Sequence, residues 1–363
     1  MAQLILVINP GSTSTKLALF DGGKMLAERG IDHPAEKLAA CDGLTAQLPM
    51  RTEAVRGFLA DCGVKTSDLS AIACRGGTFG KVEGGAYMVN DALLRDCETP
   101  LTQHPSNLAA RIGHALGHEA GIPAYIYDAV CADETRPLAR YSGLPELPRK
   151  TNCHVLNSKA VCRAAARGMG AEYENLRFVV AHLGGGISLS AHEGGRIVDA
   201  VSDDEGPMSP ERAGRLNSVK LIRYCFSSGM SAKELEGAVK GRGGLLAHLG
   251  TSDLREVERR IDTGDKKAAE MLDVMAYQIS KGIGELAAAL CGRVDAVILT
   301  GGCAYCKPLT DKIRERVEFI APVKLMPGSL EMQALAEGVS RVLNGEERAK
   351  NYEGRDKNAQ NTR

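Results

Sequence analysis

The chain has 363 residues, of which 44% are hydrophobic and 25% charged, and its 45 basic side chains balance its 45 acidic ones. This composition is ordinary for a water-soluble globular protein, and the length favours two domains. A formal net charge of zero, few aromatic residues and the absence of Trp argue against a nucleic-acid partner and against binding to an anionic membrane surface.

The cysteines and the apolar stretches indicate a reducing compartment. Eleven cysteines are an odd number in a long chain, which is untypical of a disulfide framework. The apolar start stops at Asn9-Pro10, too early for the core of a secretory leader, and no apolar run is long enough to cross a bilayer. We therefore expect a cytoplasmic protein with free thiols and no membrane partner.

The predicted elements alternate between strands and helices. Strands are predicted at residues 3–9, 15–20, 69–74, 123–127, 177–182, 187–191 and 294–299. Helices are predicted at residues 50–61, 106–120, 157–168, 214–227, 265–290 and 331–343. This alternation predicts an α/β protein. The helix over 265–290 is apolar on all sides and is expected to be buried or subunit-facing, whereas the charged tail from Asn344 is expected to be frayed or disordered.

The first predicted strands belong to an internal repeat. The stretch "LILVINPGSTSTKLALFDGGK" is a strand, a Gly/Ser-rich turn, a second strand and a Gly-Gly hairpin. The stretch "FVVAHLGGGISLSAHEGGRIVDA", residues 178–200, repeats this order, with its hairpin 172 residues further on. A third Gly-rich turn, Thr300-Gly301-Gly302, follows the strand at 294–299. Three such turns favour backbone cradles for phosphate over ordinary hairpins, although one alone would be a weak signal.

The order of seven short motifs resembles the acetokinase family, which comprises acetate, butyrate and branched-chain carboxylate kinases within the actin/Hsp70/sugar-kinase fold. The motifs are "NPGSTSTK", "RGG", "YDAV", "CHVLNSKAV", "HLGGGIS", "GTSDLRE" and "LTGGCAYC", and the likeness covers about residues 4–340. It is greatest to the butyrate and branched-chain members. The resemblance implies two duplicated actin-like (RNase H-like) domains flanking a nucleotide cleft, residues 1–149 with a returning helix in 332–363, and residues 150–331. It also implies a homodimer or a larger homo-oligomer.

The reaction implied by the resemblance is phosphoryl transfer between ATP and a short-chain carboxylate, giving ADP and an acyl phosphate, with Mg²⁺ as the metal. A carboxylate is ionised at pH 7 and needs no general base, so the site must chiefly supply cations and hydrogen-bond donors. Acyl phosphates are stronger phosphoryl donors than ATP, so ATP synthesis is the expected direction in cells. Three alternatives stay open: an acetate or propionate kinase, a kinase of the same fold that acts on a hydroxyl group, with Asp128 as base, and a non-enzymatic, actin-like ATP-dependent assembly protein.

Four residues match the family's catalytic positions. Arg75 in "ACRGG" and Arg212 in "MSPERAG" would clamp the substrate carboxylate and the phosphoryl group, because a planar guanidinium binds oxyanions in a bidentate manner. His154 in "TNCHVLN" would donate to a phosphoryl oxygen in the transition state, and Asp128 would lie near Mg²⁺. A lone Arg or His is more often a surface or structural residue, but Arg75 follows a buried strand and precedes two glycines.

The remaining residues are implied for the nucleotide and the metal. Asn9 and Glu331 would join Asp128 around Mg²⁺, and Asn9 would also reach the γ-phosphate. The implied nucleotide contacts are Asn9, Ser12, Lys16, His182, Gly184, Gly185, Gly186, Ser252, Asp253, Leu254, Arg255, Gly301 and Gly302. For Lys16, closing the hairpin is an alternative role. Acetate kinases usually carry an aromatic residue at the position of Leu254, which leaves the stacking partner of the adenine open.

Three positions bear on the size of the acid. Gly77, Thr102 and Cys153 stand where acetate-specific relatives carry bulkier side chains. The extra volume is expected to favour a straight or branched acid of four or five carbons over acetate or propionate, since each buried methylene contributes roughly 0.8 kcal/mol.

Two metal-like patterns are expected to bind no metal. Cys303-Ala304-Tyr305-Cys306 has no second CxxC to complete a zinc site, and His114 and His118 have the spacing of helical ligands without a Glu between them. The stretch "GSTSTK" has the wrong glycine spacing for a P-loop.

Overall fold

The computed structural model of the chain describes residues 3–355. The chain folds into two compact units, each described on its own. Unit 1 runs to Asp133 and resumes at Leu330, whereas unit 2 is the continuous segment Glu134–Ser329. These borders differ from the predicted ones at 149/150 and 331/332, and they place Glu331 in unit 1.

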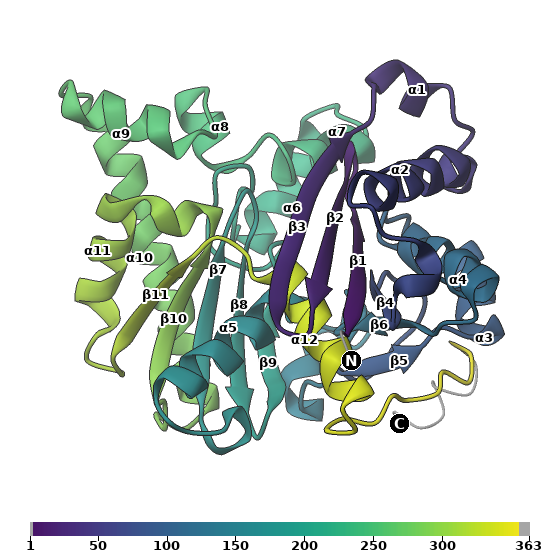
Figure 1. Cartoon of the computed structure of the whole chain (residues 1–363). Coiled ribbons are helices and arrows are strands. Elements are labelled where there is room, and N and C mark those ends of the chain that lie inside the picture. The colour runs from purple at the N-terminus through teal and green to yellow at the C-terminus, as the bar shows by residue number, and fades with distance from the viewer. Residues whose placement is uncertain (1–2, 356–363) are drawn as a thin grey trace. The chain divides into compact units, whose positions relative to one another are not determined.

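Unit 1 is built on a six-stranded sheet in the order β3-β2-β1-β4-β6-β5 (Figure 1). Its strands are β1 (Leu4–Pro10), β2 (Ser14–Asp21), β3 (Lys24–Asp32), β4 (Ala71–Arg75), β5 (Ala86–Met88) and β6 (Ala124–Tyr127). Strands β1, β4 and β6 run parallel, whereas β2, β3 and β5 are antiparallel to their neighbours. The parallel strands are almost entirely buried, which explains their continuous aliphatic sequences.

Helices from both ends of the chain cover this sheet. The helices described in unit 1 are α1 (Ala35–Ala39), α2 (Leu48–Asp61), α3 (Asp91–Glu98), α4 (Asn107–Ala120) and α12 (Glu331–Leu343), with 3₁₀ turns at Thr45–Gln47 and Thr66–Asp68. Helix α4 packs on β4 and β6, and α12 packs on β1 and β4 (Figure 1). The C-terminal helix therefore returns to the first strands of the chain.

The expectation of a frayed tail is wrong for residues 344–355. The backbone N–H of Lys350 donates to the carbonyl of Ala86 on β5 at 2.8 Å. Tyr352 is buried, its ring lies edge-on to Phe79 with centroids 5.2 Å apart, and its hydroxyl donates to Asp96 at 2.7 Å. One buried aromatic residue thus anchors a segment whose charged composition suggested disorder. The rest of the predicted tail, residues 356–363, lies outside the described residues.

Unit 2 contains a five-stranded sheet in the order β11-β10-β7-β8-β9. Its strands are β7 (Phe178–Leu183), β8 (Ile187–Glu193), β9 (Arg196–Val201), β10 (Ala296–Gly301) and β11 (Val323–Pro327). Its described helices are α5 (Val155–Gly168), α6 (Ser218–Ser227), α7 (Ala232–Val239), α8 (Gly244–Leu249), α9 (Leu254–Asp262), α10 (Lys266–Ala289) and α11 (Lys307–Val317), with 3₁₀ turns at Pro137–Arg140, Tyr173–Asn175 and Gly302–Tyr305. Two mixed sheets with packed helices confirm the α/β prediction.

The internal repeat has a structural counterpart. In each unit the first two strands of the repeat pair antiparallel, and a parallel strand from later in the chain, β4 or β10, lies on the other side of the first strand. The pairing of the second and third strands shifts register between Leu19 and Phe20 in unit 1, and between Ala191 and His192 in unit 2. These positions are again 172 residues apart, so even the bulge recurs.

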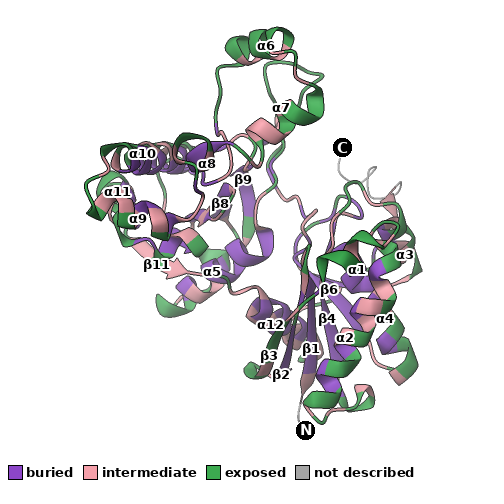
Figure 2. Ribbon diagram, turned by 90° about the horizontal axis from the view of Figure 1, so that it is seen from above, coloured by how far each residue is buried: buried purple, intermediate pink, exposed green. Residues whose placement is uncertain are grey.

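The helices of unit 2 differ in burial (Figure 2). Helix α10 contributes Leu272, Met275, Ile279 and Ile283, all fully buried, to the core of the unit. Helices α6 and α7 contain no buried residue. In residues 3–355, none of the helices combines the length and apolarity that a bilayer crossing needs. The eleven cysteines are free thiols.

Candidate functional site

Three predicted site residues lie at the ends of neighbouring parallel strands of unit 1. Strands β1 and β4 pair up to Ile8 and Cys74, so Asn9 and Arg75 come next at the same edge of the sheet. Strand β6 pairs with β4 in the same direction, and Asp128 directly follows it. Ligands of open α/β sheets bind at the carboxyl ends of parallel strands. The topology thus brings these three side chains to one edge.

Glu331, the first residue of α12, connects Asn9 with Arg75. Its Oε1 accepts a hydrogen bond from Nη1 of Arg75 at 2.6 Å, and its Oε2 accepts one from Nδ2 of Asn9 at 3.1 Å. The Nε of Arg75 is buried and has no hydrogen-bond partner within the described part of the chain. A guanidinium with a buried, unused donor is suited to an oxyanion ligand.

His104 is a neighbour of this cluster that sequence reasoning missed. It precedes α4, and its Nδ1 accepts a hydrogen bond from the backbone N–H of Ser106 at 3.2 Å, so a neutral ring carries its proton on Nε2. Burial and the positive charge of Arg75 lower the pKa of His104, partly opposed by Glu331. The available signal was "QHPSN", a His beside Pro just before a predicted helix.

Asp128 has a strained backbone. Its φ is 41°, its Oδ1 accepts from the N–H of Gly85 at 2.8 Å, and its own N–H donates to the Gly85 carbonyl at 3.1 Å. A residue other than Gly at positive φ costs about 1–3 kcal/mol, and such residues cluster at functional sites. The loop containing Gly85 thus fixes a buried carboxylate at the end of β6.

The first Gly-rich turn, residues 11–13, joins β1 to β2. Lys16 lies directly across from Asn9 in the β1–β2 pair, so the two side chains are on the same face of the sheet. Ser12 and Thr13 are exposed, and their N–H groups have no acceptor among residues 3–355. The turn therefore has backbone donors available for an anion.

The protein itself fills the space beside Gly77. A Cβ on Gly77 would lie 1.9 Å from Oδ1 of Asn107, which accepts from the N–H of Thr78 at 2.7 Å. The carbonyl of Thr102 accepts from Oγ1 of Thr78 at 2.6 Å. Close packing against Asn107 thus explains why this position has no side chain. The extra substrate volume expected from the sequence then depends on Thr102 and on Cys153, which is partly buried just before α5 in unit 2.

In unit 2 the two predicted histidines stack on each other. The rings of His154 and His182 lie 3.8 Å apart between centroids and within 6° of parallel. Nδ1 of His154 lies 2.8 Å from Oγ of Ser188, and Nδ1 of His182 lies 3.0 Å from Nδ2 of Asn157. Because the Asn157 amide nitrogen can only donate, His182 accepts at Nδ1 and carries its proton on Nε2. Two charged rings at this distance would repel, so the stack favours at least one neutral imidazole.

Asn157 was missed by sequence reasoning. It is fully buried on α5, and its Nδ2 also donates to Oγ1 of Thr300 at 3.2 Å. Thr300 in turn donates to the carbonyl of Gly328 at 3.3 Å. These bonds connect α5, β7 and β10 and fix the plane of the His182 ring. The signal was a polar amide about one turn after His154, directly behind the apolar pair Val155 and Leu156.

The second Gly-rich turn lies beside Arg212. The turn consists of Gly184, Gly185 and Gly186. Nε of Arg212 donates to Asp203 at 3.3 Å, and its Nη1 lies 3.6 Å from Glu211. A Cβ on Gly186 would lie 2.6 Å from Asp203, and one on Gly185 would lie 3.0 Å from Glu211. The glycines thus let an Arg with two carboxylate partners approach the turn.

A cavity of about 480 Å³ in unit 2 unites the segments expected to hold adenosine. Its lining residues are Ser252, Asp253, Leu254, Arg255, Glu258, Gly302, Cys303, Tyr305 and Cys306. A Cβ on Gly302 would meet no atom within 4 Å, whereas one on Gly301 would lie 2.3 Å from the carbonyl of Leu183. Gly302 leaves room in the cavity, and Gly301 with φ 88° shapes the turn. Hydrogen bonds from Arg255 lower the pKa of Asp253 to about 2, so this lining carboxylate stays charged.

Tyr305 is the aromatic residue among those that line this cavity. Its side chain is 72% exposed and lines the same cavity as Leu254. Sequence reasoning treated it only as a spacer of the CxxC. Burial raises the pKa of Cys303 to about 11 and that of Cys306 to about 12, which keeps both as unreactive thiols at neutral pH.

Among residues 3–355, no group of three or more His, Cys, Asp or Glu side chains is arranged to hold a metal ion. Mg²⁺ typically takes only one or two protein carboxylates and completes its shell with water and phosphate oxygens. The oxygens of Asn9, Asp128 and Glu331 are donors of the hard type that Mg²⁺ prefers, so this set fits the expected metal.

The family profile and similar sequences agree on one family of enzymes. A profile described as the acetokinase family matches residues 146–320. The chain is 49% identical over 350 residues to a protein named "Probable butyrate kinase 2" from Caldanaerobacter subterraneus subsp. tengcongensis, covering 96% of this chain and 99% of that relative. It is 42% identical over 351 residues to "Butyrate kinase 2" from Clostridium acetobutylicum, again covering 96% and 99%.

Solved structures with the same fold include acetate and propionate kinases. The acetate kinase from Porphyromonas gingivalis superimposes with a TM-score of 0.78 at 20% identity, covering 94% of this chain and 100% of that one. A propionate kinase from Francisella tularensis superimposes with a TM-score of 0.73 at 17% identity, covering 93% and 98%.

Proposed function

The chain belongs to the acetokinase family and is a carboxylate kinase, and we propose that its acceptor is a straight or branched acid of four or five carbons. In this proposal ATP and the acid give ADP and an acyl phosphate, and the reaction runs toward ATP synthesis in cells. The near full-length likeness to relatives named butyrate kinases supports the acceptor. The direction follows from the chemistry, since an acyl phosphate is the stronger phosphoryl donor.

One observation carries the proposal: the Nε of Arg75 is buried and has no hydrogen-bond partner within residues 3–355, although the side chain as a whole is 11% exposed. Glu331 occupies only Nη1 among the bonds described for this side chain. A buried donor without a partner is costly unless a ligand binds it. A carboxylate or phosphoryl oxygen is the ligand that a guanidinium binds best.

The proposed step needs no catalytic base. One carboxylate oxygen attacks the γ-phosphorus, and the bond from that phosphorus to the bridging β-phosphate oxygen breaks, releasing ADP. The acid is already ionised, so no side chain has to take a proton. Arg75, Arg212 and His154 would stabilise the negative charge on the transferring group. Such stabilisation by fixed cations and donors supplies most of the catalysis in phosphoryl transfer.

Mg²⁺, when bound by Asn9, Asp128 and Glu331, would neutralise charge on the nucleotide phosphates. Asn9 and Glu331 already touch each other at 3.1 Å, so the amide restrains the carboxylate. Asp128 is held by its two bonds to Gly85. The backbone and its neighbours thereby keep these oxygens in place before any ligand arrives.

The nucleotide would be bound by Gly-rich turns and by the unit 2 cavity. Ser12 and Lys16 lie at the first turn, and Gly184–Gly186 form the second; both are proposed to contact phosphates. The adenosine would occupy the cavity lined by residues 252–255 and Gly302. His182, whose proton is on Nε2, would donate near the second turn.

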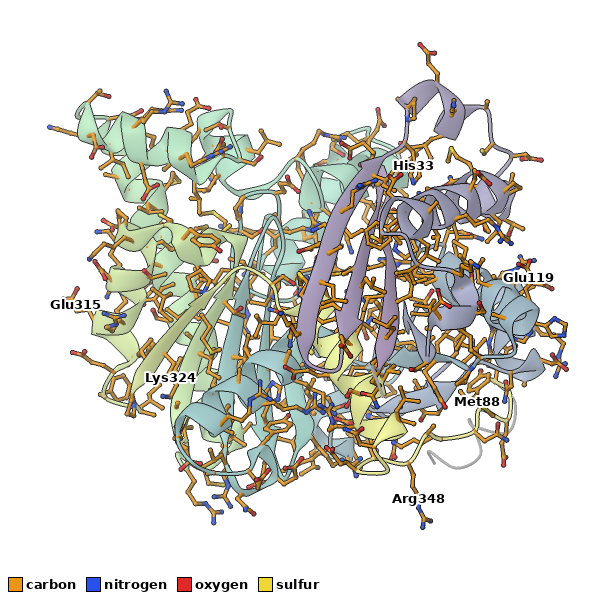
Figure 3. All side chains as sticks on the ribbon, viewed as in Figure 1. His33, Met88, Glu119, Glu315, Lys324 and Arg348 are labelled. Atoms are coloured by element: carbon orange, nitrogen blue, oxygen red, sulfur yellow. The ribbon has the colours of Figure 1, made fainter. Side chains whose placement is uncertain are left out.

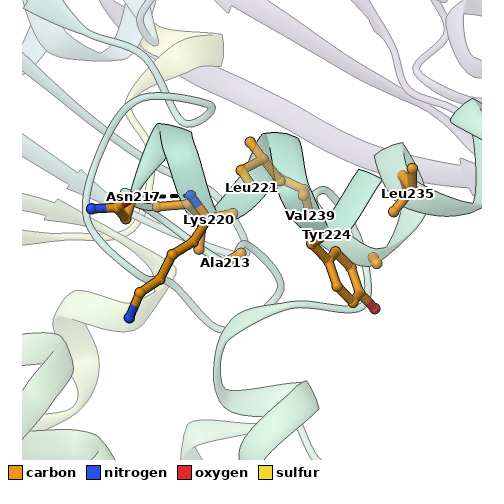
Figure 4. Close-up of a pocket in the computed structure, with 9 residues that line it drawn as sticks. Ala213, Asn217, Lys220, Leu221, Tyr224, Leu235 and Val239 are labelled. Atoms are coloured by element: carbon orange, nitrogen blue, oxygen red, sulfur yellow. Dashed lines mark hydrogen bonds between the residues drawn. The ribbon is translucent and has the colours of Figure 1, made fainter. Parts of the chain in front are cut away.

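We also propose that the protein is cytoplasmic and forms a homo-oligomer through α6 and α7. Helix α6 exposes the large apolar side chains of Val219, Ile222, Tyr224 and Phe226, and Leu216 is exposed just before it. The two helices also enclose an apolar cavity of about 340 Å³ (Figure 4). Helix α6 carries Lys220 and Arg223 and α7 carries Glu234 and Glu236, so two copies related by a twofold axis can pair opposite charges. Light scattering tests this, since a monomer would contradict it.

The first test is acyl hydroxamate formation with ATP, Mg²⁺ and hydroxylamine, across acetate, propionate, butyrate, isobutyrate, valerate and isovalerate. A maximum at four or five carbons is the expected result. A maximum at acetate would overturn the acceptor while leaving the chemistry. ATP turnover without added acid, or phosphorylation of a sugar instead, would favour the assembly protein or the hydroxyl-directed kinase.

A further inference from the structure

Arg51 is a fully buried cation that the proposed mechanism does not use. It lies on α2, and its side chain has no exposed surface. Its Nη2 donates to the carbonyls of Gly11 at 3.0 Å and Ser12 at 3.2 Å, and its Nη1 donates to the carbonyl of Ser14 at 2.9 Å. The guanidinium therefore lies directly behind the first Gly-rich turn.

The remaining donors of Arg51 bind neutral groups. Nη1 also donates to Oγ1 of Thr15 at 2.9 Å, and Nε donates to Oε1 of Gln47 at 3.0 Å. All five N–H bonds of the guanidinium are thus used. No carboxylate is among these partners in the described part of the chain. The side chain is satisfied by hydrogen bonds, but its charge is not neutralised by any of them.

In this turn the carbonyl groups are hydrogen-bonded within the protein, whereas two N–H groups are left without an acceptor in the described residues. The Thr13 carbonyl accepts from the backbone N–H of His33 at 2.8 Å, and Figure 3 shows His33 near the end of β3. Every carbonyl from Gly11 to Ser14 is therefore bound by a donor of unit 1. The N–H groups of Ser12 and Thr13, by contrast, have no acceptor within residues 3–355. Donors without acceptors and an uncompensated cation occur at the same turn.

We propose that Arg51 is a positioning residue for phosphate binding: it fixes the carbonyls of the turn and supplies a positive charge behind the free N–H groups. The ligand is the polyphosphate chain of a nucleoside triphosphate. This inference rests on the proposed function only for the identity of that ligand. It explains why a buried charge, which is ordinarily costly, is kept without a counter-ion.

The groups that extend this network, Thr15 and His33, add no second positive charge beside Arg51. Oγ1 of Thr15 accepts from Arg51 and lies 2.8 Å from Nε2 of His33, so its own hydrogen is free to be donated to the ring. Burial and the charge of Arg51 lower the pKa of His33, with Asp32 opposing in part. A neutral His33 lets the Thr15 hydroxyl donate to it.

The experiment measures binding of adenosine, ADP and ATP by calorimetry for the full chain and three variants. Gln47→Glu keeps the bond to Nε but places a carboxylate against the guanidinium, so the charge is cancelled with the packing preserved. Arg51→Met removes both charge and bonds. Arg56→Met is the matched control, because Arg56 is exposed on the same helix and pairs with Glu119.

The expected result is that Gln47→Glu and Arg51→Met weaken ATP binding roughly tenfold or more while adenosine binding is unchanged. Arg56→Met should match the parent chain for all three ligands. A purely structural role predicts that Gln47→Glu folds and binds ATP like the parent, which would overturn the proposal. Equal losses for adenosine and ATP would also overturn it.

Two safeguards keep the outcomes separate. If Arg51→Met does not fold, Gln47→Glu alone decides, because it retains every acceptor of the guanidinium. The assay requires ATP binding but no carboxylate acceptor, so a wrong acceptor in the proposed function would leave this test intact. Absence of ATP binding by the parent chain would refute both the proposed function and this inference.

Discussion

Replacing Gly77 by Ala distinguishes a packed glycine from a glycine that enlarges the substrate site. The added Cβ would lie 1.9 Å from Oδ1 of Asn107. Because real contacts of this kind are rarely below about 3.0 Å, Asn107 must retreat by more than 1 Å and release the N–H of Thr78, now bound at 2.7 Å. An unsatisfied buried donor costs about 1–3 kcal/mol, and overpacking costs another 1–3 kcal/mol.

The expected destabilisation is therefore about 2–6 kcal/mol, which for a unit of this size lowers Tm by roughly 5–20 °C. The assay is thermal unfolding of the full chain, followed by hydroxamate formation with butyrate and acetate. Gly30→Ala is the control, because a Cβ there would meet nothing within 4 Å. A second variant, Gly77→Ala with Asn107→Ala, should recover part of the lost stability. If Gly77→Ala is as stable as Gly30→Ala and shifts preference from butyrate to acetate, the packing argument is refuted and the volume interpretation holds.

Three further predictions concern the site and its surroundings. Arg75→Ala should lower kcat by orders of magnitude while circular dichroism stays unchanged, since the buried donor for the transferring group is lost; near-normal turnover would remove Arg75 from the reaction. Tyr305→Ala should raise KM for ATP roughly tenfold and leave KM for the acid unchanged in steady-state kinetics, whereas Tyr305→Phe should behave like the parent. Burial and the charges of Arg51 and Arg75 lower the pKa values of His33 and His104. Below about pH 6.5 these histidines therefore bind protons in the unfolded chain but stay neutral in the folded one. The free energy of unfolding should accordingly fall as the pH decreases from about 7.5 to about 5.5. Urea unfolding at both pH values checks this, and a His33→Gln variant should lose part of the dependence.

The sequence was sufficient to predict those parts of the molecule that repeat a local pattern. Aliphatic runs predicted the central strands, and the matching hairpins at Gly22 and Gly194 predicted the duplication, which the shared bulge now supports. The ends of strands β1, β4 and β6 also followed, because a strand's last residues can be read from where its apolar run stops. Asn9, Arg75 and Asp128 were singled out by resemblance to the acetokinase family, and each directly follows one of these runs or ends it.

Features that depend on contacts between segments far apart in the chain could not be predicted from the sequence. Arg51 appears in the sequence as one charged residue of a helix, and only the tertiary structure shows that it lies behind the turn at 11–13. The close approach of Asn107 to Gly77 likewise has no local signature in the sequence. The tail seemed disordered because its anchoring residue, Tyr352, is a single aromatic among charged residues.

The discontinuity of unit 1 has a consequence for synthesis on the ribosome. Unit 2 is complete in sequence once Ser329 has been made, but unit 1 lacks α12 and the tail until nearly the whole chain has emerged. Until then Asn9 and Arg75 are without the carboxylate of Glu331, and the edge of β5 is without Lys350. The first unit to be translated is therefore the last to be finished, and the nascent chain must keep its exposed sheet from pairing with others during that interval.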